Sequence, residues 1–179
     1  MTIKTILSEE DYLAYLLYSF SKNKQSRANR RRSWLVISGM FFVIGYMFYG
    51  SNNFYSYYFF GAGVISLIFY PLYQRYHYKK HYRKFVQDKL GYRIGKEGTI
   101  NFGPEVIATE DVTGESKINT SEVAEIIEIS THYFVKLNSG DGLVIPKTAT
   151  GNPNFLDELL TVLDNPNIKI NRELDWQWK

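Results

Sequence analysis

The sequence predicts an α+β membrane protein, with a two-helix transmembrane hairpin and a small antiparallel β domain closed by a C-terminal helix. Three observations support this prediction. Residues 33–74 contain no Asp, Glu, Lys, Arg or His. Clusters of basic residues lie on both sides of that stretch. From residue 95 onward, helical periodicity gives way to short alternating runs that Gly and Pro interrupt.

The uncharged stretch divides into two apolar segments, residues 34–49 and 54–73, joined by the turn formers Gly50-Ser51-Asn52-Asn53. As helices they would span about 24 and about 30 Å, against about 30 Å of hydrocarbon in a bilayer. The first segment is short and would either extend over Ser33 and Gly50 or locally thin the bilayer. A soluble protein that buries both helices in its core is the alternative, but the rest of the 179-residue chain is too small to cover them.

Twelve basic residues flank this predicted hairpin, whereas its turn carries no charge. Because basic residues stay on the cytoplasmic side, we expect a multi-pass protein of the inner membrane with both termini in the cytoplasm. We call these residues the basic collar and expect them at the membrane surface. They are Lys22, Lys24, Arg27, Arg30, Arg31, Arg32, Arg75, Lys79, Lys80, Arg83, Lys84 and Lys89.

Residues 1–32 are predicted to hold a short strand, an amphipathic helix and a basic run on the cytoplasmic side. Residues 2–6 alternate polar and β-branched side chains. Ser8 is a helix cap, with the carboxylate of Asp11 three positions on. Residues 12–20 then place apolar side chains on one face. This helix either lies on the cytoplasmic leaflet or docks on the rest of the protein.

The other three regions follow the hairpin. Residues 75–91 continue the helical pattern as a basic juxtamembrane helix, and Gly91 is a helix stop. Residues 92–165 contain several short strands followed by a helix with an Asn-Pro start signal. Residues 166–179 are predicted to be a polar tail.

The order of these parts resembles the YcxB-like family of bacterial membrane proteins, and the resemblance covers nearly the whole chain. That resemblance implies two membrane helices followed by a PH-like domain, and it implies no activity. The matching motifs are Glu10-Asp11-Tyr12, Arg30-Arg31-Arg32 before Trp34, Ser121-Glu122-Val123-Ala124-Glu125-Ile126 after Ile118, Tyr133-Phe134-Val135 and Ile145-Pro146-Lys147.

The sequence shows no arrangement typical of an enzyme. The absence of cysteine excludes a disulfide scaffold and a thiol nucleophile. No Gly-rich phosphate loop occurs, and His132 is the only histidine of the predicted β domain. Glu122, Glu125 and Glu128 are expected to form a row facing solvent. We therefore predict no catalytic residue, cofactor, metal, nucleic acid or small-molecule substrate.

Charge favours a protein partner for the β domain. Residues 98–167 hold three basic and eleven acidic residues, a balance of −8. We predict an integral membrane protein that presents a cytoplasmic PH-like domain as a protein-interaction or regulatory module, with an unknown protein as its partner. The alternatives are a module that recognises lipid headgroups at the inner leaflet and a structural subunit of an envelope complex.

Overall fold

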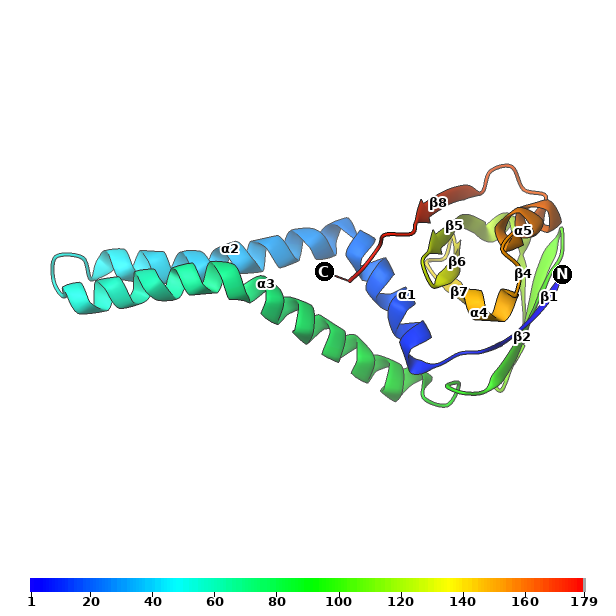
Figure 1. Cartoon of the computed structure of the whole chain (residues 1–179), viewed down its shortest axis with the longest axis horizontal. Helices are drawn as coiled ribbons and strands as arrows, with labels where there is room; N and C mark the ends of the chain where they lie inside the picture. The colour runs from blue at the N-terminus through cyan, green and yellow to red at the C-terminus, as the bar shows by residue number, and fades with distance from the viewer. Residues whose placement is uncertain (179) are drawn as a thin grey trace. The chain divides into compact units, whose positions relative to one another are not determined.

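The computed structural model describes residues 1–178, and the chain divides into two compact units. We call residues 1–15 and 83–177 the sheet unit, and residues 16–82 with Trp178 the helical unit. The described residues form five α-helices and two four-stranded sheets, so the predicted α+β class is confirmed. Figure 1 labels the helices and strands of both units.

The first sheet of the sheet unit is antiparallel, with strand order β1-β2-β3-β4. Its strands are β1 (Thr2–Ile6), β2 (Glu97–Phe102), β3 (Val106–Asp111) and β4 (Gly114–Asn119). The predicted strand at residues 2–6 is confirmed, and Ile3 lies opposite Ile100 in the register of β1 and β2. The N-terminus thus joins a sheet whose other strands begin more than ninety residues later.

The second sheet has the order β7-β6-β5-β8. Its strands are β5 (Val123–Ile129), β6 (His132–Leu137), β7 (Gly142–Pro146) and β8 (Lys169–Glu173). Two features differ from the prediction: the strands form two sheets, and β8 pairs with β5 in parallel. The predicted polar tail, residues 166–179, therefore contains an edge strand of this sheet, β8, and its last residue lies outside the described residues.

One core joins both sheets to α5 (Phe155–Leu163). The 3-10 turn Thr120–Glu122 leads into β5, and the short helix α4 (Lys147–Thr150) follows β7. Apolar residues recur along α5 at helical spacing, and four of its nine are buried. The core includes Ile3, Ile100, Phe102, Ile107, Val123, Ile126, Tyr133, Val135, Ile145, Phe155, Leu156, Leu159 and Leu163.

Three long helices complete the structure: α1 (Glu9–Lys22), α2 (Lys24–Met47) and α3 (Asn53–Leu90). The predicted cap of α1 is confirmed, because the Ser8 backbone N–H donates to the Asp11 carboxylate at 2.7 Å and the Ser8 hydroxyl accepts from the Asp11 N–H at 3.4 Å. The basic run at residues 24–32 forms the start of α2 itself, which Asn23 caps. The helix after the second apolar segment continues without interruption to Leu90, as predicted. In the helical unit, α2 and α3 run side by side in opposite directions (Figure 1).

Candidate functional site

The interior of the α2–α3 pair is built from small and hydroxyl-bearing residues. Ser38 and Ser56 are each 1% exposed. Their hydroxyls bond across the pair, Ser38 with the Ser66 hydroxyl at 3.0 Å and Ser56 as donor to the Gly45 carbonyl at 2.9 Å. A Cβ at Gly45 would lie 3.3 Å from the Ser56 carbonyl and from the Phe60 ring, so glycine permits the close approach of the two helices.

The Leu67 carbonyl of α3 has no donor four residues later in its own helix and is also bonded across this interior. Pro71 lies inside α3 and has no N–H to donate to the Leu67 carbonyl four residues earlier. The Trp34 indole N–H of α2 donates to that carbonyl at 3.2 Å. One residue away, the hydroxyls of Ser33 and Tyr70 lie 2.7 Å apart. These hydroxyl, indole and carbonyl groups therefore find their partners within the pair.

The outer surface of the same pair is apolar. Large aliphatic, aromatic and thioether side chains are exposed along both helices, and the exposed fraction is 62% at Val43 and 59% at Ile65. The pattern is the reverse of a water-soluble helix pair, which buries its apolar side chains and exposes its polar ones. The exposed residues include Leu35, Val36, Met40, Val43, Met47, Val64, Ile65, Ile68, Phe69 and Leu72.

Length and hydropathy distinguish the two helices. In the part of the chain that the structure describes, α3 is the one helix that is long and apolar enough to cross a membrane. The uncharged part of α2 begins at Ser33, directly after three arginines, and the helix ends at Met47. The fifteen residues of this uncharged part rise only about 23 Å. The uncharged part of α2 is therefore shorter than the hydrocarbon core of a bilayer, about 30 Å, although α2 lies along α3.

Aromatic rings surround the turn of the hairpin. Phe48, Phe54, Tyr55, Tyr58 and Phe59 line a hollow of about 370 Å³. The Phe48 and Phe59 rings are stacked, with centroids 6.0 Å apart. Aromatic side chains collect at boundaries between water and hydrocarbon, and the turn that they surround is uncharged.

The basic collar is shared between the two units. Nine of its residues belong to the helical unit, whereas Arg83, Lys84 and Lys89 belong to the sheet unit. Arg83 forms ion pairs with Glu9 and Glu10 on α1, so it holds the beginning of α1 against α3. The Arg83 side chain remains 39% exposed while it makes this contact between helices.

Within the helical unit, the two basic clusters lie beside one another because α2 and α3 are antiparallel. The Gln74 side chain donates to the Arg30 carbonyl at 3.2 Å, and the Arg30 guanidinium lies over the Tyr78 ring, 5.9 Å from its centroid. Trp178 joins this contact: its indole N–H donates to the Arg75 carbonyl at 3.1 Å, and its ring lies 5.1 Å from the Arg30 guanidinium. The sequence prediction did not assign Trp178 to this place.

In the sheet unit, a histidine joins β6 to α1. His132 is 7% exposed, and its Nε2 lies 2.8 Å from an Asp11 carboxylate oxygen. Burial raises the pKa of Asp11, but hydrogen bonds from Ser8 and His132 outweigh that effect and set the pKa below its usual value. The hydroxyl of Thr131 lies 2.7 Å from Nδ1 of the same ring. Both ring nitrogens are therefore engaged, and the histidine fixes the start of α1 on the sheet.

The three glutamates predicted to form one solvent-facing row do not form it. Glu122 lies in the 3-10 turn before β5 and is exposed, whereas Glu125 and Glu128 are half-buried. Glu128 pairs with Lys147 at 2.7 Å and with Arg172 of β8 at 3.4 Å. A β-bulge between Val123 and Glu125 and the pairing with β8 explain the difference.

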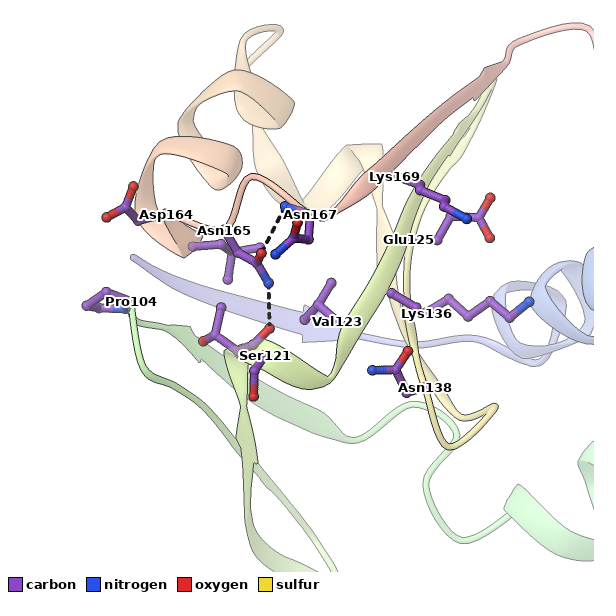
Figure 2. A pocket seen from close by; sticks show the side chains of 13 residues that line it. Pro104, Ser121, Val123, Glu125, Lys136, Asn138, Asp164, Asn165, Asn167 and Lys169 are labelled. Carbon is purple, nitrogen blue, oxygen red and sulfur yellow. Dashed lines mark hydrogen bonds between the residues drawn. The ribbon is translucent and has the colours of Figure 1, made fainter.

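A polar cavity of about 570 Å³ lies in the sheet unit where β5 and β8 separate (Figure 2). The register of the two strands starts at Glu125 and Lys169. Before that point the residues of the two segments line opposite walls, Ser121 on one and Asn165 and Asn167 on the other. Sequence reasoning missed this cavity, because it depends on the unpredicted strand β8.

No family model, curated protein or solved structure matches this chain. The functional proposal therefore rests on the geometry described above.

Proposed function

We propose that this chain is an integral membrane protein whose α2–α3 hairpin crosses the bilayer twice and which presents a cytoplasmic, PH-like sheet unit as a protein-interaction or regulatory module. The proposal is supported above all by the distribution of side chains in the hairpin, which exposes apolar residues and buries polar ones. Exposed Val43 and Ile65 suit hydrocarbon, and buried Ser38 and Ser56 are satisfied within the pair. Polar backbone groups in a bilayer need such internal partners.

The pairing of the helices supports two crossings. Contacts join Gly45 to Ser56 near the turn, and Arg30 to Gln74 at the other end. If α3 crosses the hydrocarbon, α2 must therefore lie along the same depth. The shorter apolar part of α2 is accommodated by local thinning of the bilayer and by long basic side chains that reach to the headgroups.

Charge supports the orientation. Basic residues gather at the open end of the hairpin, and the turn has none. The positive-inside rule then assigns the open end, with both termini, to the cytoplasm of a cell with an inner membrane. The order of basic run, helical hairpin and C-terminal β domain is also the order that the resemblance to the YcxB-like family implies.

Charge also favours protein over lipid as the partner of the sheet unit. Capture of anionic headgroups uses clustered cations, each worth about 1 kcal/mol near the leaflet. Residues 98–167 carry three lysines against eleven acidic residues, and Lys147 is already paired with Glu128. An anionic leaflet would repel this unit.

Two measurements test the proposal. Alkaline carbonate should leave the full-length protein in the membrane pellet, and detergent should release it. Reporters fused after Phe20 and after Asn165 should lie in the cytoplasm, and an insertion at Asn52 should lie on the opposite side. Release by carbonate alone would refute membrane integration, and a C-terminus outside the cytoplasm would refute the hairpin topology.

A further inference from the structure

We propose that the polar cavity between β5 and β8 is a binding cleft for an extended peptide segment that carries a carboxylate. This inference rests on the proposed role of the sheet unit as a protein-interaction module and names the chemistry of its partner. The cleft has a volume of about 570 Å³ and opens where two parallel strands separate (Figure 2).

The cleft is a fixed feature of the fold. Pro166 lies three residues before β8 and has no N–H, so it cannot donate to a ladder with β5. Asp164 ends α5 in a left-handed conformation, with φ of 44°. The Asn165 side chain reaches across to the Thr120 carbonyl at 3.5 Å, in place of a backbone bond. The strands are therefore held apart at this point.

The lining suits a peptide backbone. Asn138, Asn165 and Asn167 supply amide groups that both donate and accept, and Ser121 adds a hydroxyl. Val123 forms part of the lining and is buried. None of the thirteen lining residues is aromatic, so the cleft has no surface on which a base or sugar ring would stack. The pairing of β5 with β8 starts only at Glu125, so the edge of β5 before that residue is open on the side of the cleft. A peptide strand added along this edge would use alternating donors and acceptors of this kind.

Charge at one end of the cleft specifies the carboxylate. Lys136 of β6 and Lys169 of β8 both lie opposite Glu125 in the register of the sheet. Glu125 accepts a hydrogen bond from Asn171, and within residues 1–178 neither lysine forms an ion pair. At this end two cations and one anion leave a single positive charge, whereas Asp164 lies at the opposite end of the cleft (Figure 2). One local positive charge matches one carboxylate better than a multiply charged phosphate.

The test uses the full-length protein in nanodiscs of neutral phosphatidylcholine. A phage-displayed library of random linear peptides is selected against it, and the enriched sequences are made as fluorescein-labelled peptides with free and with amidated C-termini. Fluorescence anisotropy then measures Kd. We expect one of two results. Either the enriched peptides share an Asp or Glu and bind equally well after their C-terminus is amidated, or they bind only with a free C-terminal carboxylate.

Variants assign the binding to the cleft. Lys136→Glu and Lys169→Glu should each weaken binding by about threefold to tenfold, whereas Lys117→Glu on β4 makes the same charge change away from the cleft and should leave Kd unchanged. Ala124→Trp, within the lining, fills the cleft without adding charge and should abolish binding while circular dichroism shows an intact fold. Failure of the library to enrich any sequence, enrichment of basic peptides, or equal binding by Ala124→Trp would overturn the inference. Carbonate extraction reports only on the hairpin, so such a result would leave the membrane proposal standing.

Discussion

Replacement of Ile65 by Asp distinguishes a hairpin in lipid from a hairpin in water. Ile65 lies near the middle of the second apolar segment, and its side chain is 59% exposed. In water, a charge at so exposed a site changes stability by about 0.5 kcal/mol at most. At the centre of a bilayer, Asp costs about 2.5 to 3.5 kcal/mol and Ile contributes about −0.3 to −0.6 kcal/mol. The change therefore costs about 3 to 4 kcal/mol in lipid.

A difference of this size lowers the ratio of inserted to non-inserted chains by two to three orders of magnitude. The assay is translation in the presence of inner-membrane vesicles, with protease protection of a tag inserted in the turn. Asn52→Asp is the matched control, because it adds the same charge at the turn and keeps an oxygen that can accept from the Tyr55 N–H. Equal insertion of Ile65→Asp and Asn52→Asp would refute the assignment of this face to lipid.

Three further substitutions, one of them with a matched control, test particular contacts. Trp34→Phe removes the donor to the Leu67 carbonyl and should weaken the helix pair by about 0.6 to 1.7 kcal/mol in a steric-trap unfolding assay in bicelles; unchanged stability would show that this bond contributes nothing. Gly45→Leu places a side chain where the facing backbone is 3.3 Å away, and it should cost about 1 to 3 kcal/mol. Gly39→Leu, with nothing within 4 Å, should cost less in the same assay, and the opposite order would contradict the close approach. Asp11→Ala should destabilise the protein at pH 7 by about 1 to 3 kcal/mol. Because the pKa of Asp11 is lowered in the folded state, its contribution is complete above about pH 4 and is lost as pH falls through the folded-state pKa; melting curves that fail to converge in acid would disprove this.

The elements that sequence predicted well carry strong local signals. The cap formed by Ser8 and Asp11 and the turn at residues 50–53 rely on neighbours in the chain, so composition and spacing reveal them. The helical pattern of residues 75–90 is equally local. The inward position of Ser38 and Ser56 could have been read only with the register of the two helices, because hydroxyl residues alone do not specify a face.

The strand β8 could not be predicted from its own residues. In its sequence KINRE only Ile170 is apolar, and that side chain is 45% exposed. Its place is set by the open edge of β5, which lies about forty residues earlier. The same non-local pairing creates the cavity and brings Lys169 opposite Glu125. A local pattern contains none of this information.

The backbone hydrogen bonds of the hairpin support the same surroundings as its apolar surface, the lipid bilayer. Near the end of α2, the Tyr49 N–H bonds to the Tyr46 carbonyl and not to the Gly45 carbonyl four residues earlier. The Ser56 hydroxyl of α3 donates to the Gly45 carbonyl instead. The carbonyl left without a donor by Pro71 is likewise bonded from the other helix. Water could reach the Leu67 carbonyl, because Leu67 is only half-buried, whereas Gly45 is buried in either solvent. In hydrocarbon, each unsatisfied group costs several kcal/mol, and the helices must supply the donors themselves. The bond from Trp34 to the Leu67 carbonyl therefore supports the bilayer placement independently of hydropathy.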